Sequence, residues 1–318
     1  MITGVKIQGG YLVAALLIAP VLSAASVAPN FLPAGEIIVQ RVFANQPLPK
    51  WENGFILARD GAENPAPQVY VFDRSGRPLR SHRVVLPDAD RVILREAAIS
   101  PKGTVAGAGT AVARDGRSAF FIAWLDSAGA IRQVARTSPF SAPRLCFTAD
   151  ETLWAAGREY LPDRNSKPEY DVLRRYGPDG RLVASLLPRS SFPESRWDPA
   201  RDALLVSSGD RVALYSPVES VWVEISSVGE ILSRVSGSCG VGEPGGLALT
   251  SSGSTYLSLR DKNSYTATPL CELDRQSQQW IRALVNGRPD QGGYIVGADG
   301  DEVIIYRGRG TLVRLRTD

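Results

Sequence analysis

Few side chains of this sequence could act as a catalytic base or a soft metal ligand. His82, within Arg80–Arg83, is the single histidine, and the cysteines are Cys146, Cys239 and Cys271. Imidazole is the usual general base and transition-metal ligand, so the composition excludes sites built from several histidines. No two cysteines have the C-x-x-C spacing of zinc or thioredoxin-type sites. We expect a surface His82 without a catalytic role, and Cys146 as a small buried apolar side chain.

Polar side chains recur just before the segments that we expect to be the innermost strands of a repeated sheet. This set comprises Glu52, Glu96, Arg144, Glu194, Arg196, Glu243, Asp290 and Gln291. If the four glutamates converge, they could hold a hard cation such as Ca²⁺, with Glu52 and Glu243 as the candidate ligands; we expect no other cofactor. Arg144 and Arg196 would instead suit an anionic or carboxylate-bearing ligand. The alternative is that these side chains satisfy one another around a wet channel.

The longest connection between expected strands, Arg158–Tyr170, mixes tyrosines with charged residues. Aromatic residues and arginine are enriched where proteins bind their partners. We therefore predict a partner-binding loop with Arg158, Tyr160, Arg164 and Tyr170 as its contact residues. The alternative is a solvated loop without a partner.

The N-terminal segment predicts export. Lys6 is followed by uncharged residues up to Glu36, with an apolar centre at Tyr11–Leu22 and small residues at Ser23–Ala25. A short positive region, an apolar run and small residues are typical of a secretory signal, here cleaved after Ala25. The mature protein would be periplasmic or extracellular and would have no membrane span. The alternative is an uncleaved anchor, because residues 7–28 are long enough to cross a bilayer.

Export would also permit a disulfide bond. We expect Cys239 and Cys271 on the same face of the molecule, so they could pair in an oxidising compartment. The overall charge points to no nucleic-acid partner, because 36 Lys and Arg residues nearly balance 33 Asp and Glu residues and no block of like charge occurs.

The elements that must position these residues follow from two repeated turn patterns. The first pattern, an apolar strand before an Asp/Gly turn, occurs at Val69–Gly76, Ile122–Gly129, Leu173–Gly180 and Val223–Gly229. The second falls between them, at Ala98–Gly103, Phe147–Glu151, Trp197–Arg201, Leu249–Gly253 and Val296–Gly300. Two interleaved series with one period of about 50 residues indicate four strands per unit, which is the pattern of a β-propeller. A sandwich or two small barrels are the alternatives.

The chain length predicts six such units and a closed ring. We expect a signal peptide at residues 1–25, a short linker at 26–35 and a single six-bladed propeller at 36–318, present as a monomer. The last unit has only three strand-like segments, so we expect Glu36–Phe43 to pair with it as the fourth strand. This pairing would remove an open sheet edge.

Strand direction predicts where binding residues lie. With the strands of a blade labelled A to D from the axis outward, the A-to-B and C-to-D turns share one face and are tight. The B-to-C and D-to-A connections share the opposite face and are longer. We call these the tight-turn face and the long-loop face. Loops on a rigid scaffold concentrate binding residues, so we expect a site on the long-loop face.

Units such as Ala98–Val105 and Gly246–Gly253 resemble the exported bacterial six-bladed propellers of the NHL and TolB-like superfamily. The resemblance covers 36–318 and implies a fold rather than an activity. Gluconolactonase-like members carry a Glu, Asn and Asp metal site on the axis; Glu52 could match the Glu, but their Ser-Asn-Gly segment has no counterpart here. We predict a non-catalytic exported scaffold that binds a protein, peptide or glycan on its long-loop face. A metal-dependent hydrolase or lactonase with axial carboxylates is the alternative.

Overall fold

The computed structural model describes residues 28–40, 47–61, 64, 66–193, 198–240, 242–260, 268–289 and 291–318. Their regular structure consists of β-strands and one short 3-10 helix, η1 (Arg189–Ser191). None of the helical structure in these ranges is long and apolar enough to cross a membrane. The predicted signal peptide and its cleavage site lie outside the described residues.

Sixteen of the strands form four separate antiparallel sheets, each built from four consecutive strands. The first sheet contains β2 (Lys50–Glu52), β3 (Phe55–Arg59), β4 (Gln68–Phe72) and β5 (Pro78–Arg83). The second contains β6 (Arg91–Ile99), β7 (Val105–Val112), β8 (Ser118–Leu125) and β9 (Ile131–Arg136). The third contains β10 (Phe140–Phe147), β11 (Leu153–Glu159), β12 (Asp171–Tyr176) and β13 (Leu182–Pro188). The fourth contains β14 (Leu204–Ser208), β15 (Arg211–Ser216), β16 (Val221–Ser226) and β17 (Ile231–Ser236).

The remaining strands form one eight-stranded sheet in the order β18-β19-β20-β21-β1-β24-β23-β22. One half contains β18 (Glu243–Leu249), β19 (Thr255–Arg260), β20 (Leu270–Asp274) and β21 (Gln279–Val285). The other half contains β22 (Tyr294–Asp299), β23 (Glu302–Tyr306), β24 (Thr311–Thr317) and the N-terminal strand β1 (Asn30–Ile38).

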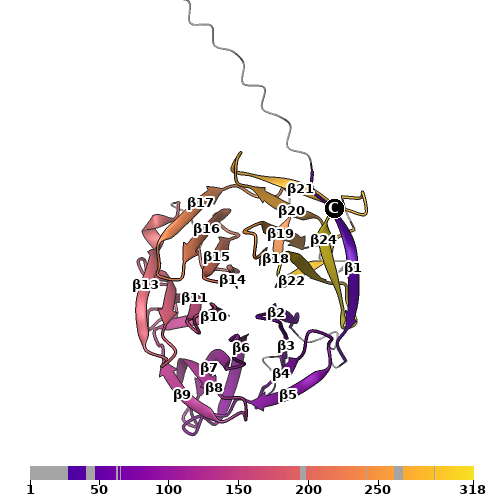
Figure 1. The fold of residues 1–318 in the computed structure, drawn as a ribbon. Coiled ribbons are helices and arrows are strands. Elements are labelled where there is room, and N and C mark those ends of the chain that lie inside the picture. Colours follow the sequence, from indigo (N-terminus) through magenta and orange to yellow (C-terminus); the bar gives the residue numbers. More distant parts are fainter. Residues whose placement is uncertain are drawn as a thin grey trace, which may run out of the picture.

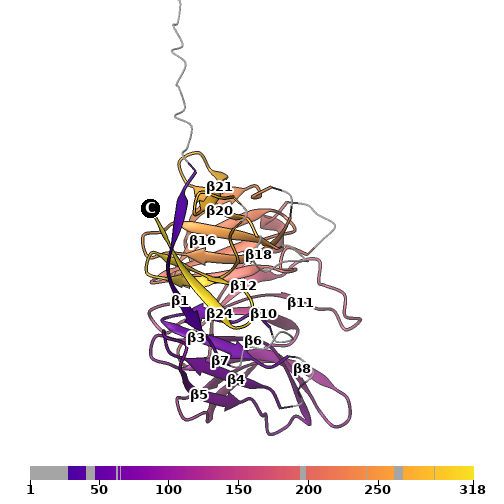
Figure 2. The same ribbon diagram turned by 90° about the vertical axis from the view of Figure 1, so that its right-hand side faces the viewer.

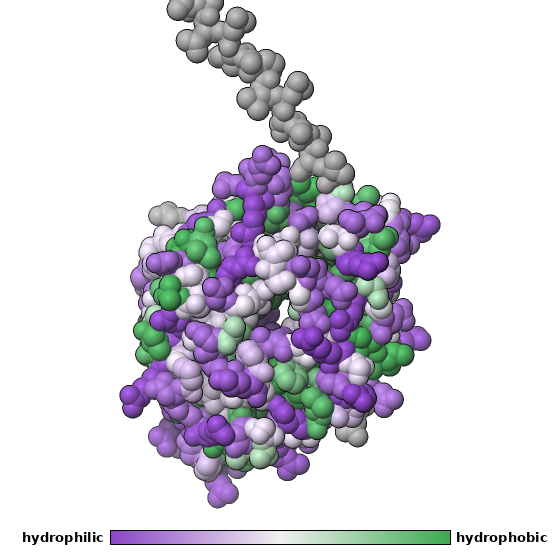
Figure 3. Space-filling view, in the orientation of Figure 1, coloured by the Kyte–Doolittle hydropathy of each residue, from purple (hydrophilic) through white to green (hydrophobic). Residues whose placement is uncertain are grey.

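The sheets surround a common centre (Figure 1). Strands β2, β6, β10, β14, β18 and β22 lie nearest the centre, and β5, β9, β13, β17, β21 and β1 lie at the perimeter. The ring is continuous because β2 of the first sheet also contacts β22 of the last. Hydrophilic residues cover most of the face shown in Figure 3, around a central hollow. The prediction of an all-β, propeller-like arrangement of four-stranded antiparallel sheets is confirmed.

The N-terminal strand pairs with the C-terminal one, as predicted, but it occupies different residues. Strand β1 runs antiparallel to β24 from the pair Phe31 and Thr317 to the pair Ile38 and Thr311. It therefore starts six residues before the expected Glu36, inside the stretch predicted to be a linker. The physical reason is Phe31, which is fully buried and packs edge-to-face against Tyr256 with ring centroids 5.1 Å apart. The start of β1 also pairs in parallel with β21, a contact that the sequence did not predict.

Apolar side chains fill the spaces between neighbouring groups of strands. Between the third and fourth sheets, for example, Trp154 and Val172 share one buried cluster with Val212 and Val223. These side chains point to the faces of their sheets at every second position, as the pleat of a strand requires. Burying such area at about 25 cal/mol per Å² is the main force that holds adjacent sheets together.

His82 is buried, so the prediction of a surface histidine is wrong. It lies on the outer strand β5, but its side chain is only 2% exposed. It packs against the β8–β9 turn of the next sheet, where a Cβ atom on Gly129 would lie 2.7 Å from Nδ1. Arg80 Nε donates a hydrogen bond to His82 Nε2 at 3.1 Å. Burial and the adjacent Arg80 charge lower the pKa of His82, opposed by Asp126.

The structure settles the pairing that the sequence left open, and Cys146 is buried as predicted. Cys239 and Cys271 form a disulfide bond with a Cα–Cα distance of 5.9 Å. Cys146 is a buried free thiol on the inner strand β10. Its pKa is raised to about 12, chiefly because burial disfavours the thiolate.

Candidate binding site

The structure does not bring the predicted axial residues into one ring. Glu96 and Arg144 follow irregularities in β6 and β10 and lie within these strands, with Arg144 Nη1 3.8 Å from Glu96 Oε2. Glu243 is the exposed first residue of β18, and Gln291 precedes β22. Glu194, Arg196 and Asp290 lie outside the described residues.

Glu52 lies at the opposite end of the axis from its predicted position. It is the last residue of β2, next to the tight turn at Asn53 and Gly54, rather than before the strand on the long-loop face. Its Oε2 accepts a hydrogen bond from the Ile99 backbone N–H at 2.9 Å, and its Oε1 accepts one from the Phe147 N–H at 2.7 Å. Both carboxylate oxygens therefore hold strand ends together.

The surroundings of Glu52 form a polar cluster on the axis, which we call the axial cluster: Lys50, Glu52, Asn53 and Ser207. Lys50 Nζ lies 3.1 Å from Glu52 Oε2, and Asn53 Nδ2 donates to the Ile99 carbonyl at 2.8 Å. Ser207 Oγ donates to the Phe147 carbonyl at 2.7 Å. Burial raises the pKa of Glu52, against the opposing effect of Lys50 and the two N–H donors. The cluster links the inner strands of four sheets.

The described residues contain no group of three or more His, Cys, Asp or Glu side chains that could hold a metal ion. Glu52 is on the tight-turn side of β2, whereas Glu243 begins β18 on the long-loop side. The two candidate ligands are therefore at opposite ends of their strands, and the described carboxylates do not form a four-glutamate cage.

The long-loop face carries a cavity of about 940 Å³. It is lined by strand residues of the second and third sheets and by the β11–β12 and β13–β14 connections. In Figure 2 the β11–β12 connection, which forms part of its wall, projects to the right of the ring. Its charged lining residues are Arg95, Arg144, Arg158, Arg189, Arg201, Asp198 and Asp202. We call it the arginine cavity, because five guanidinium groups face only two carboxylates.

The innermost arginine of the cavity is held by backbone oxygens. Arg144 donates from Nε to the Ala203 carbonyl at 2.8 Å and from Nη1 to the Pro143 carbonyl at 2.9 Å. Arg189 likewise donates to the carbonyls of Lys167 and Pro168, both at 3.3 Å. These bonds fix the position of both guanidinium groups. Arg144 is also paired with Glu96, whereas the bonds of Arg189 to the two carbonyls bring no opposing charge.

Arg158 and Tyr160, predicted from the loop composition, both line this cavity. The guanidinium carbon of Arg158 lies 4.8 Å from the centroid of the Tyr160 ring, and its Nε donates to the Tyr160 hydroxyl. Arg158 Nη1 is 4.0 Å from Asp198 Oδ2, which is beyond hydrogen-bonding distance. Arg158 therefore has donors left for a ligand.

The other two predicted loop residues have different positions. Tyr170 is 5% exposed, and its hydroxyl donates a hydrogen bond to Asp198, so it supports the cavity wall from behind. Burial raises the pKa of the Tyr170 hydroxyl above its usual value. Arg164 is exposed in the Leu161–Asn165 turn and does not line the cavity. Arg95 lies in β6, and Arg189 and Arg201 lie on the β13–β14 connection. They were not predicted, because only the fold brings these segments beside Arg158.

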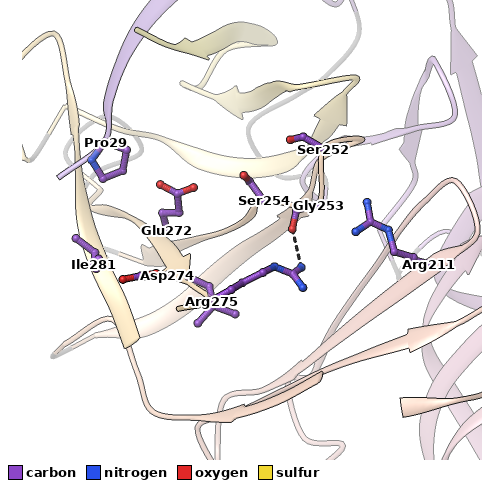
Figure 4. A pocket seen from close by; sticks show the side chains of 10 residues that line it. Pro29, Arg211, Ser252, Gly253, Ser254, Glu272, Asp274, Arg275 and Ile281 are labelled. Carbon is purple, nitrogen blue, oxygen red and sulfur yellow. Dashed lines mark hydrogen bonds between the residues drawn. The ribbon is translucent and has the colours of Figure 1, made fainter. Parts of the chain in front are cut away.

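A second cavity, of about 400 Å³, lies on the tight-turn face between the fourth sheet and β18–β21 (Figure 4). It contains two arginines, but both are used within the protein. Arg211 Nη1 and Arg275 Nη1 lie 3.2 and 2.5 Å from the oxygens of Glu224, which is 1% exposed. Arg275 also donates to the Gly253 carbonyl at 2.6 Å, the bond drawn in Figure 4. This cavity is therefore a structural ion-pair site and a weaker candidate.

The comparisons with known proteins agree with the fold. No family model matches the chain, and no curated protein matches it. A candidate exported protein from Bacteroides fragilis has a similar structure, with a TM-score of 0.57, 12% identity, and coverage of 91% of this chain and 99% of that one. A Bacteroides caccae protein of unknown function has a TM-score of 0.51 at 11% identity, over 85% and 94% of the two chains. A gluconolactonase from Xanthomonas campestris has a TM-score of 0.51 at 15% identity, over 92% and 98%. At these identities the similarity shows the fold alone.

Proposed function

We propose that this protein is an exported, non-catalytic binding scaffold that recognises a protein, peptide or glycan on its long-loop face. The observation that carries this proposal is the arginine cavity, whose arginines come from the second sheet, the third sheet and the β13–β14 connection. Ligand sites are commonly concave and preformed, with a few polar groups that set orientation. Loops on a rigid ring supply such a site.

We also propose that the scaffold is a six-bladed propeller of the NHL and TolB-like type. Among the described residues, the strand pairing at the middle of the eight-stranded sheet consists of two parallel pairs, Asn30 with Leu284 and Phe31 with Val285. Each half contains four strands, as each of the other sheets does. Separate apolar clusters also lie between the successive four-stranded groups. Counting each half as one blade accounts for these observations.

The disulfide between Cys239 and Cys271 supports export into the periplasm or beyond, because such bonds persist in oxidising compartments. The apolar N-terminal segment and the candidate exported protein of similar fold agree with this location. An uncleaved N-terminal anchor would give the same orientation outside the inner membrane.

The alternative of a metal-dependent hydrolase has no comparable support among the described residues. Both oxygens of Glu52 accept backbone hydrogen bonds, and Lys50 Nζ lies 3.1 Å from Oε2, so a cation there would compete with the ammonium group already paired with this carboxylate. We expect the unfolding midpoint of the protein to be the same after chelation and with added Ca²⁺. A midpoint raised by Ca²⁺, and returned to its starting value by Glu243→Gln, would favour the hydrolase instead.

The scaffold proposal is tested by screening glycans and peptides for stabilisation of the chain that begins at Ser26. A ligand that binds only the folded state at about 100 times its Kd adds about 2.7 kcal/mol to the free energy of unfolding. We expect Arg158→Ala to remove this stabilisation. Arg181→Ala is the matched control, since Arg181 is an exposed arginine on the tight-turn face and its side chain is 86% exposed. Stabilisation that is insensitive to Arg158→Ala but lost in Arg181→Ala would contradict the proposal.

A further inference from the structure

We infer that the arginine cavity binds an acidic oligosaccharide, whose sugar units carry carboxylates beside their hydroxyl groups. The inference rests on the proposed binding function and names the class of ligand. Three features of the cavity support it: an excess of positive charge, guanidinium donors that the protein does not use, and a lining rich in hydroxyl and amide groups.

The arginine cavity has an excess of positive charge. Its lining carries five guanidinium groups against Asp198 and Asp202, and Glu96 lies 3.8 Å from Arg144, so two positive charges remain without a nearby carboxylate. The positive charge of the cavity also acts on Arg59, the last residue of β3. Arg59 Nη1 donates to the Leu94 carbonyl at 3.3 Å. Burial, together with the charges of Arg144 and Arg95, lowers the pKa of Arg59, and Glu96 only partly compensates. A concave site of one sign attracts ligands of the opposite charge.

The unused donors specify what kind of anion fits. Arg95 is exposed in β6 and forms no hydrogen bond or ion pair with the described part of the chain. Arg158 uses Nε on Tyr160 and forms no hydrogen bond with Asp198. Guanidinium groups present paired N–H donors that match the two oxygens of a carboxylate. Two such arginines in one cavity suit a ligand with more than one carboxylate.

The neutral lining favours a saccharide over an acidic peptide. The hydroxyls of Thr110 and Ser141 line the cavity and form no hydrogen bond within the described residues. Asn165 is also exposed there; its Nδ2 donates to Asp163 Oδ2 at 2.9 Å, and its side-chain oxygen faces no donor in the described part of the chain. These groups can exchange hydrogen bonds with sugar hydroxyls. Peptide recognition depends on buried apolar anchors, but Tyr160 is already covered by Arg158 and by Phe120, whose ring centroid is 5.6 Å away. The cavity therefore lacks a free aromatic pocket for an apolar side chain.

The test is isothermal titration of the chain beginning at Ser26 with two uronic acid oligomers, oligogalacturonate and an alginate oligomer. The methyl ester of oligogalacturonate is the neutral control, and poly-glutamate is the peptide control. We expect at least one uronate to bind, and the ester to bind at least tenfold more weakly because it lacks the charge. Arg95→Ala and Arg158→Ala should each weaken uronate binding about tenfold. Arg181→Ala should not. Urea unfolding of each variant verifies its fold.

The outcomes separate this inference from the scaffold proposal. Absence of uronate binding, equal binding of acid and ester, or tighter binding of poly-glutamate would overturn the acidic oligosaccharide. In the last two cases, loss of binding in Arg158→Ala would still uphold a scaffold that uses its long-loop face. Uronate binding that is unaffected in both cavity variants would overturn the inference, and its loss in Arg181→Ala would overturn the scaffold proposal as well. A steep fall in affinity with added salt would support the inference, because salt screens the attraction between the exposed arginines and an anionic ligand.

Discussion

Glu52 and Phe147, 95 residues apart in the chain, are joined by a hydrogen bond of 2.7 Å from the Phe147 backbone N–H to Glu52 Oε1. The other carboxylate oxygen accepts the Ile99 N–H at 2.9 Å. One buried side chain thus fixes the ends of β2, β6 and β10 relative to one another. Since β6 and β10 also carry Glu96 and Arg144, the axial cluster on one face helps to position the arginine cavity on the other.

Glu52→Gln should destabilise the protein. Glutamine keeps one acceptor oxygen but places an NH₂ group against a backbone N–H, so one buried donor loses its partner and Lys50 loses its counter-charge. An unsatisfied buried donor costs about 1–3 kcal/mol. Urea unfolding should therefore show a lower midpoint at an unchanged slope. Glu230→Gln, at an exposed position of the β16–β17 turn, is the control and should leave the midpoint unchanged. Equal midpoints for both variants would contradict the role of Glu52.

The repeat period located nearly every strand, because Gly turns and alternating apolar residues are local signals. It did not locate Glu52, because β2 has only three residues and is too short for alternation to show where it starts. Strand irregularities near Glu96 and Arg144 are also invisible in the sequence, and they moved both residues from before their strands to within them. The composition of one loop predicted Arg158 and Tyr160. The rest of the cavity depends on contacts between units, which a repeat pattern does not encode.

The buried His82 should make stability depend on pH below neutrality. Its pKa is lower in the folded protein than its ordinary value of 6.5, because burial and the Arg80 charge disfavour the imidazolium. Below pH 6.5 the unfolded chain therefore binds more protons at this site, so the free energy of unfolding falls as the pH is lowered. Above this window the histidine is neutral in both states and contributes no pH dependence. His82→Gln should reduce the slope between about pH 6.5 and 5. An unchanged slope in urea titrations would show that His82 is accessible or already charged.

The three cysteines should give a defined pattern of thiol titration. Cys146 is fully buried with a pKa of about 12, so the native protein should not react with a thiol reagent at neutral pH. In denaturant without reductant one thiol should react, and after reduction all three should, because Cys239 and Cys271 are paired. Cys146→Ala should show no reactive thiol before reduction. Rapid modification of the native protein, or three thiols without reductant, would contradict this pattern.

Closure of the ring by β1 should depend on one side chain above all. Phe31 is fully buried where β1 meets both β24 and β21, and it packs against Tyr256. Phe31→Ala should therefore lower the free energy of unfolding by about 3–5 kcal/mol, as truncation of a buried aromatic side chain usually does. Ile38 lies at the other end of the same strand and is 66% exposed, so Ile38→Ala should change stability by less than about 0.5 kcal/mol. If both variants unfold at the same urea concentration, the start of β1 is not what holds the ring closed. If only Phe31→Ala is destabilised and also becomes prone to aggregation, the exposed edges of β21 and β24 account for it, since unpaired strand edges promote association between molecules.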